Sequence, residues 1–428
     1  MLKKLLCICL VMLAVCGMGS AAAAADIRVA LVSGQYTAEI SCDDEFIVTD
    51  NANGQSVNVP KGRYFLNIAD GKLTLENFTF GSAITISASE GKVLPEINKR
   101  QYAGRVTASI DGGRLLVRNI VDLEEYVESV LPAKTMPIWP DEAIKAQAVA
   151  ARSYAWYMMN NSGGKAYDIA ATDQELTYQG LGSEKDAISK FVRSTAGQVL
   201  ADGSGSQVMA VTTSSSGGKT ASSLEAFGTA RSYLTSVTDY DSDSPDYDWE
   251  YSIAPALLQN FLEQRGHVVG KLASVRLSPI DDPGSDRSAT GRVRYVIFSG
   301  DAGTVQITGS ELRELLSLNS TLFDVETGTP TPETLKVPIE NYYGMEIGSK
   351  DIDIKVNEDN KPVWKNLVRS YHLIGGGKDE KIIFYGHGKG SGVGLSMWGA
   401  RGMVNANGKT TYRQILSHYY PGTYITRL

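Results

Sequence analysis

An alanine-rich run from residue 141 to residue 160 indicates where the core of this chain lies. Apolar residues such as Ile144, Ala151 and Met158 recur at intervals close to 3.6 residues, which predicts a helix. Small side chains on one face of a helix let neighbouring elements approach closely. We therefore expect this helix at the centre of the fold.

The first 25 residues have the three-part layout of a secretory signal peptide. Lys3 and Lys4 precede an apolar run from residue 5 to residue 15, and small residues follow as far as Ala25. The apolar run is shorter than the roughly 20 residues that a membrane span needs. The sequence therefore predicts export, cleavage after Ala25 and no membrane span in the mature chain. Attachment through a lipidated Cys16 is the less favoured alternative.

The mature chain would keep only one of the four cysteines, Cys42. It could then form neither an internal disulfide nor a cysteine-based zinc site, so burial of apolar side chains must stabilise it. Loss of Lys3 and Lys4 would make its net charge more negative than the −7 of the whole chain. An acidic chain with no basic block is a poor partner for nucleic acid or anionic lipid.

Strand and turn patterns suggest the domain organisation. Residues 26–100 contain short β-type runs separated by turn signals such as Asn53-Gly54, which predicts a small N-terminal β module. Residues 101–428 mix helices and strands and form the main domain, with residues 253–322 as an α+β subdomain inside it. Because no strand order indicates a parallel sheet, the expected fold class is α+β, a mixed core around the alanine-rich helix.

Several sequence strings in the main domain resemble, in the same order, those of the SpoIID/LytB family. The strings are 119–126, 130–133, 139–155, 214–218, 231–234, 291–293, 309–313, 392–396 and 415–422. The resemblance covers about residues 101–428 and is weaker over residues 26–100. It implies a SpoIID-like fold and a role at the cell wall.

Characterised members of this family are peptidoglycan proteins. Some act in sporulation and resemble lytic transglycosylases that cut glycan strands already stripped of peptide, with a glutamate as general acid and then base. Others are described as enhancers of a cell-wall amidase. The resemblance implies a secreted or cell-envelope protein that contacts peptidoglycan glycan strands and has a cell-wall amidase as a possible partner.

The resemblance fails at the position that carries the family's chemistry. The family glutamate follows a Val-Pro-Ser or Val-Pro-Ala string ahead of Trp-Pro, and this chain has Lys134 there. A lysine ammonium has an ordinary pKa of about 10, so it is a poor proton donor at neutral pH. This predicts a degenerate active site, that of a pseudoenzyme. Lys134 itself is either a solvated loop lysine or a residue of the old cleft that pairs with sugar hydroxyls or a muramyl carboxylate.

Other polar positions of the family have changed as well. Thr213 and Ser391 stand where the family has histidines, and Met397 replaces a glutamine. The positions that hold zinc in some members correspond to Ala170, Gln174 and Glu175. The expected cofactor is therefore none, zinc included.

Two residues are candidates to replace lost groups. Glu128 would be the relocated acid of an active lytic transglycosylase, although a helix-surface carboxylate is the commoner case. His387, four residues before Ser391, would replace the missing histidine if the glycine-rich loop shifts its register. The remaining alternative is a purely structural envelope protein without glycan contact.

The residues expected to line a glycan-binding groove come from the family strings. An aromatic side chain among them would stack on a sugar face or lie in the core, and Arg152 would bind a ligand or form a structural salt bridge. The full set is Trp139, Arg152, Tyr178, Thr213, Ser216, Gly217, Gly218, His387, Ser391, Gly392, Trp398, His418 and Tyr419.

Overall fold

The computed structural model describes most of the chain after the predicted signal peptide. The described residues are 25–90, 93–131, 138–172, 177–181, 185–328, 334–340, 346–353, 370–375, 377 and 380–428. Two compact units divide the chain, Met1–Val211 with Gly422–Leu428 (unit 1) and Thr212–Pro421 (unit 2). The predicted signal peptide lies outside the described residues except for Ala25.

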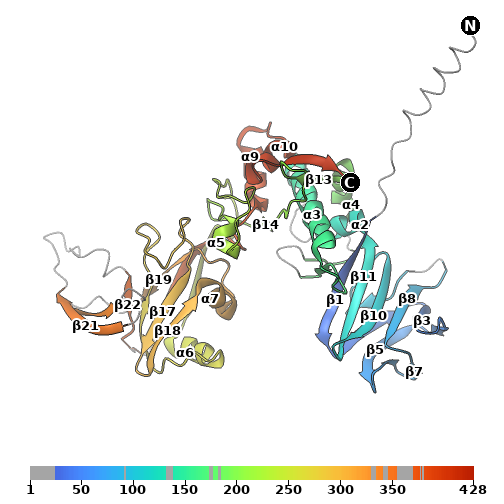
Figure 1. The fold of residues 1–428 in the computed structure, drawn as a ribbon, viewed down its shortest axis with the longest axis horizontal. Coiled ribbons are helices and arrows are strands. Elements are labelled where there is room, and N and C mark those ends of the chain that lie inside the picture. The colour runs from blue at the N-terminus through green and yellow to red at the C-terminus, as the bar shows by residue number, and fades with distance from the viewer. Residues whose placement is uncertain are drawn as a thin grey trace, which may run out of the picture. The chain divides into compact units, whose positions relative to one another are not determined.

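Unit 1 contains a seven-stranded and a five-stranded sheet (Figure 1). The larger has the order β12-β1-β11-β10-β8-β3-β4 and the smaller the order β7-β6-β5-β2-β9, and β11 lies against β2 and β5. The strand bounds are β1 Asp26–Gln35, β2 Thr37–Cys42, β3 Phe46–Asp50, β4 Ser56–Val59, β5 Gly62–Ala69, β6 Lys72–Leu75, β7 Phe78–Thr79, β8 Ala83–Ala88, β9 Glu96–Ile97, β10 Arg105–Asp111, β11 Arg114–Asp122 and β12 Ile169–Ala170.

The larger sheet joins the two parts that the sequence suggested were separate. Strand β1 pairs with β11 along most of its length, and β8 pairs with β10. The predicted boundary between residues 100 and 101 therefore falls inside one sheet. Paired strands share their hydrogen bonds across this boundary, so residues 26–100 are built into the same unit as the strands that follow them.

The alanine-rich helix is α3, Asp141–Asn161, and it is central to unit 1. Apart from Lys145, its side chains from Ala143 to Ala155 are buried, and it packs against α2 (Leu123–Val130), α4 (Lys185–Ser194) and β13 (Gln198–Ala201). Strand β13 pairs with β25, Tyr424–Arg427, which returns the end of the chain to unit 1. The prediction of a buried central helix is confirmed.

Unit 2 contains short sheets with helices between them. A three-stranded sheet has the order β15-β23-β19, and a four-stranded sheet has the order β18-β17-β16-β22. The bounds are β14 Thr212–Thr213, α5 Ser223–Phe227, β15 Asp248–Ile253, α6 Pro255–Gln264, β16 Leu272–Arg276, β17 Tyr295–Gly300, β18 Gly303–Thr308, α7 Gly309–Leu316, β19 Phe323–Thr327, β20 Thr334–Glu340, β21 Glu346–Asp353, β22 Tyr371–Leu373, β23 Ile382–His387, β24 Leu395–Ser396, α9 Met397–Asn407 and α10 Tyr412–Tyr419.

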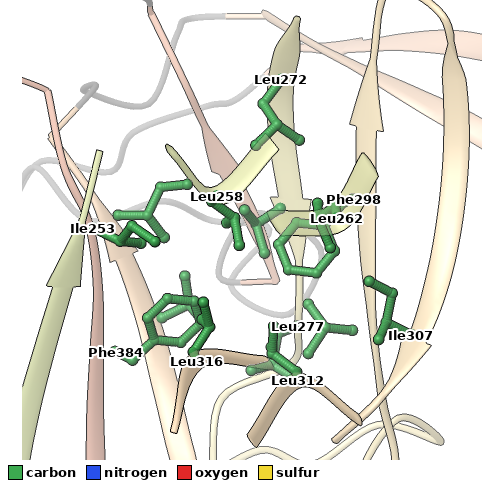
Figure 2. Close-up of a cluster of buried hydrophobic side chains, with 14 of the residues drawn as sticks. Ile253, Leu258, Leu262, Leu272, Leu277, Phe298, Ile307, Leu312, Leu316 and Phe384 are labelled. Carbon is green, nitrogen blue, oxygen red and sulfur yellow. The ribbon is translucent and has the colours of Figure 1, made fainter. Parts of the chain in front are cut away.

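One apolar cluster fills the space between these sheets and helices α6 and α7. Figure 2 shows side chains from both sheets, such as Phe298 and Phe384, meeting Leu258 and Leu312 of the helices. Full burial of one such side chain contributes roughly 1.5–3 kcal/mol to stability. The cluster extends from Ile253 to Phe384, so the predicted subdomain at 253–322 has its remaining strands further along the chain.

The fold class is α+β, as the sequence predicted. Most strand pairs are antiparallel, and parallel pairing occurs between β1 and β12 and between β14 and β24. Among the described residues, no helix combines the length and apolar character that crossing a membrane would require.

Candidate functional site

Two buried carboxylates organise the Ser-Ser-Gly-Gly segment of unit 2. Ser215 Oγ donates a hydrogen bond to Asp241 over 2.5 Å, and the backbone amides of Gly217 and Gly218 donate to the same carboxylate over 2.8 and 2.9 Å. One side chain thus holds three groups of the segment, which fixes its backbone. Gly217 and Gly218 have φ values of 76° and 93°, a region in which glycine is favoured.

The second carboxylate, Asp239, connects the same segment to the end of α10. It accepts hydrogen bonds of 2.5 Å from both Ser216 Oγ and Tyr419 Oη, and one of 2.8 Å from the amide of Tyr240. Burial raises the pKa of Asp239, and the nearby charge of Asp241 raises it further. Neighbouring carboxylates in a buried site resist ionising together, so the proton affinity of Asp239 depends on Asp241.

The glycine-rich segment that follows β23 lies against the Ser-Ser-Gly-Gly segment. The amide of Lys389 donates to Ser215 O over 2.8 Å, and a Cβ added to Gly388 would lie 2.7 Å from the nitrogen of Gly217. Thr213 connects the two segments, because its Oγ1 donates to Lys389 O and accepts from the amide of Gly392, both over 3.0 Å. At this histidine position of the family, a hydroxyl therefore bonds two backbone groups.

Arg292 lies beside these two segments. Its side chain is 5% exposed, and its Nη2 donates to Ser216 O over 2.7 Å. A Cβ added to Gly392 would lie 2.0 Å from Nη2 at a φ of 73°, so a side chain there would strain the backbone and displace the guanidinium. Burial lowers the pKa of Arg292 to about 10, and the charge of Glu225 opposes this shift.

His387 and Ser391 lie at the ends of this arrangement. His387 Nδ1 is 2.6 Å from Asp248 Oδ1, in an exposed pair that is ionic when the imidazole is protonated. A Cβ added to Gly217 would lie 2.8 Å from His387 Cβ, so the histidine adjoins the Ser-Ser-Gly-Gly segment. Ser391 Oγ accepts a hydrogen bond from the amide of Val393 over 3.3 Å. Of the predicted groove residues, Thr213, Ser216, Gly217, Gly218, His387, Ser391 and Gly392 therefore come together in unit 2.

The other predicted residues of unit 2 lie on and around helices α9 and α10. His418 Nε2 donates to Thr238 O over 2.7 Å, which requires the proton on Nε2 in the neutral ring. Trp398 is half-buried, and the guanidinium of Arg401 lies 5.0 Å from the centre of its ring. Tyr419 is buried against Asp239, and burial raises its pKa well above the ordinary value.

The candidate acid Glu128 belongs to unit 1 and is held by two partners. Its side chain is buried, although a helix-surface carboxylate was the commoner expectation. Ser189 Oγ donates to it over 2.9 Å, and Arg193 Nε donates to it over 3.0 Å. Lys134, the position of the family glutamate, lies outside the described residues, as do the former zinc positions Gln174 and Glu175.

Arg152 is fully buried in helix α3. It donates to both oxygens of Glu124, over 2.8 and 2.7 Å, and to the carbonyls of Gln198 and Val192. These contacts correspond to the structural salt bridge weighed from the sequence.

The two aromatic residues expected in the groove from unit 1 are also buried. The ring of Tyr178 stacks between Tyr102 and Tyr126, and its hydroxyl donates to Asn119 over 2.5 Å. Trp139 precedes helix α3 and is covered by protein. Protein covers both side chains in this structure, so neither ring presents an open face for a sugar to stack on.

The sequence did not single out Asp239, Asp241 or Arg292. The two aspartates stand at the start of an acidic stretch that ends at Asp248, and no family string covers it. Arg292 belongs to the family string Gly291-Arg292-Val293, which was recognised without a role for its arginine. One sequence signal could have pointed to these three residues, because each lies within or close to a string that resembles the family. Within the described part of the chain, no cluster of three or more His, Cys, Asp or Glu side chains is arranged to hold a metal ion.

Comparison with known proteins gives a match to one family model and several relatives. The SpoIID family model, described as "Stage II sporulation protein", matches residues 111–201. The amidase enhancer of Bacillus subtilis is 26% identical over 399 residues, which cover 91% of this chain and 52% of that protein. This chain therefore spans about half the length of the amidase enhancer.

Two further relatives match over similar lengths. The stage II sporulation protein D of Bacillus subtilis is 25% identical over 325 residues, covering 72% of this chain and 75% of that protein. An uncharacterized protein of Brachyspira hyodysenteriae is 26% identical over 330 residues, covering 77% of this chain and 73% of its own. The ordered strings, the family model over residues 111–201 and these relatives thus agree that the chain is similar to proteins of the SpoIID/LytB family.

Proposed function

We propose that this chain is an exported cell-wall protein that binds peptide-stripped glycan strands and enhances a cell-wall amidase without cutting glycan itself. Three lines of support come together. The similarity to the amidase enhancer extends over 91% of this chain. The family glutamate is replaced by Lys134, and the predicted signal peptide provides export.

The observation that carries the proposal is the state of Glu128. A general acid must reach the glycosidic oxygen to within about 3 Å and give up a proton there. The Glu128 carboxylate is only 4% exposed and accepts hydrogen bonds from Ser189 and Arg193. One carboxylate oxygen thus contacts the serine hydroxyl and the other contacts the guanidinium, so the oxygens face protein groups and not a substrate. Glu128 is therefore a poor substitute for the lost acid.

The arrangement in unit 2 is suited to binding rather than to proton transfer. The hydroxyls of Ser215 and Ser216 donate to Asp241 and Asp239, so both carboxylates are engaged in holding backbone segments. The glycines of the neighbouring segment are buried against protein, and the side chains between them, those of His387, Lys389 and Ser391, are partly exposed and available to a glycan strand.

A combined binding and stimulation assay tests the proposal. Mature protein would be incubated with amidase-stripped glycan strands and with intact peptidoglycan, and the bound fraction measured by pull-down. In parallel, the release of peptides from intact peptidoglycan by a cell-wall amidase would be followed with and without the protein. We expect retention on the stripped strands and faster peptide release. Absence of both effects would contradict the proposal.

A further inference from the structure

Arg292 differs from other buried arginines of this protein in its hydrogen bonding. Only Nη2 is bonded, to Ser216 O, while Nε and Nη1 are buried and have no hydrogen-bond partner among the described residues. Leaving a buried donor without a partner is unfavourable, and more so for a charged group. A guanidinium in this state is suited to an acceptor that the protein itself does not supply.

Two buried arginines provide the comparison. Arg287 bonds through all three nitrogens, to Ser278 O, to Gly291 O and to the carboxylate of Asp324. Arg152 likewise uses all three nitrogens and bonds the carboxylate of Glu124 directly. The fold therefore supplies a carboxylate to buried guanidinium groups at both positions, whereas it supplies none to Arg292 by a direct hydrogen bond.

The carboxylates near Arg292 are engaged elsewhere. Glu225, Asp241 and Asp239 are the acidic groups close enough to favour its charge. Glu225 accepts from the amides of Ser222 and Thr290, over 2.8 and 3.1 Å. Asp239 and Asp241 hold the Ser-Ser-Gly-Gly segment, as described above. Arg292 is thus a buried cation in an acidic neighbourhood that lacks a directly bonded anion.

We propose that Arg292 binds a carboxylate of the ligand, namely the lactyl carboxylate of muramic acid in a peptide-stripped glycan strand. This inference rests on the proposed function and names the group that is recognised. Removal of the peptide converts a neutral amide at the lactyl group into a carboxylate, which is the partner that guanidinium groups bond most strongly. Arg292 then distinguishes stripped strands from intact ones by charge.

The segment that covers Arg292 has to move for this contact to form. Gly392 lies against the guanidinium and has a φ value of 73°, and Gly390 and Gly394 also have positive φ values. A segment rich in glycine has little steric resistance to changing its backbone angles. Binding therefore involves displacement of residues 390–394 from the guanidinium and breaks the hydrogen bonds of Gly392 with Thr213 and Ala221.

A binding experiment on the whole mature protein separates this inference from the proposed function. The probes are stripped glycan oligosaccharides and the same oligosaccharides with their lactyl carboxylates methyl-esterified, titrated by calorimetry. The unaltered protein should bind the free acid at least about tenfold more tightly, as expected for a hydrogen-bonded charge pair. Arg292→Gln removes the charge and should abolish this preference. The matched control Arg287→Gln changes another buried arginine outside this contact and should retain it.

Each outcome has one meaning. If the unaltered protein binds both probes equally, the proposed function stands and Arg292 bonds buried water only. If it binds neither probe, the proposed function and this inference both fail. A preference for the free acid that survives in Arg292→Gln would assign the recognition to another cation. The comparison of the two probes on the unaltered protein remains decisive even if Arg292→Gln does not fold.

Discussion

Buried charged residues in this protein mostly serve to hold backbone segments and helices together. Glu128 illustrates this in unit 1, where it connects α2 to α4 through Ser189 and Arg193. Asp239 and Asp241 illustrate it in unit 2. Because each carboxylate has several donors, its removal should affect stability first.

Glu128→Gln should lower the free energy of unfolding by roughly 1–3 kcal/mol, because it weakens the hydrogen bonds that Ser189 and Arg193 donate to a buried carboxylate. Glycan retention and amidase stimulation should remain unchanged. Urea denaturation measures the first effect, and Glu142→Gln is the control, since its partly exposed pair with Lys145 should contribute less than about 1 kcal/mol. Loss of glycan binding in the folded Glu128→Gln protein would contradict this structural role.

Asp239 should give the stability of the protein a specific pH dependence. Its folded-state pKa is raised above the ordinary 3.8, first by burial and then by Asp241, so the folded protein binds this proton more tightly than the unfolded chain. This contribution to stability is therefore complete below about pH 4 and is lost as the pH rises through the folded-state pKa. The free energy of unfolding, measured in urea at several pH values, should fall less steeply over this range in Asp239→Asn. Equal slopes in both proteins would refute the assignment.

At the scale of elements, the glycine-rich segment depends on close contact with Arg292. Gly392→Ala introduces a Cβ 2.0 Å from Nη2 at a φ of 73°. We expect a loss of more than about 1 kcal/mol in the free energy of unfolding, since strain and a clash act together.

The control for this prediction is Gly408→Ala. Gly408 ends helix α9 with a φ of 65°, and a Cβ there would meet nothing within 4 Å. This substitution carries only the backbone strain, about 1 kcal/mol. Thermal or urea denaturation measures the loss of stability in both variants. An equal loss in the two would show that the contact with Arg292 does not contribute to stability.

Elements with a local pattern could be predicted from the sequence, and contacts between distant segments could not. Helix α3 could be predicted because the spacing of apolar residues within one short segment indicates both a helix and its burial. The pairing of β1 with β11 joins residues about 90 positions apart, and nothing in either strand specifies its partner. The same holds for the site. The family resemblance indicated Thr213, Gly217 and Gly392 as site residues, but not the contacts between their segments.

The roles of the two aspartates and the arginine in the site could not be predicted, for a related reason. Asp239 and Asp241 acquire their roles only when residues 214–218 fold against them, and Arg292 only when Gly392 lies on its guanidinium. A charged residue in a loop sequence is usually solvated, so its burial has to be learned from the structure.

At the scale of the whole molecule, the chain leaves unit 1 after Val211 and returns to it at Gly422. Strand β25 then pairs with β13, from Gln198 opposite Arg427 to Ala201 opposite Tyr424. Deleting residues 422–428 should therefore destabilise unit 1 selectively, because β13 loses its partner's hydrogen bonds. Hydrogen exchange should show faster exchange in β13 and unchanged protection in β16 and β17 of unit 2. Equal loss of protection in both units would contradict the division.

The central claim, glycan binding without glycan cleavage, is tested most directly by a search for cleavage products. Mature protein would be incubated with amidase-stripped glycan, and the soluble fraction scanned for 1,6-anhydromuramic ends, with Lys134→Glu in parallel and Lys61→Glu as the matched charge control. We predict no such ends from the unaltered protein or the control, and products from Lys134→Glu would locate the ancestral active site. Anhydromuramic ends released by the unaltered protein would contradict the account and make Glu128 the first residue to substitute.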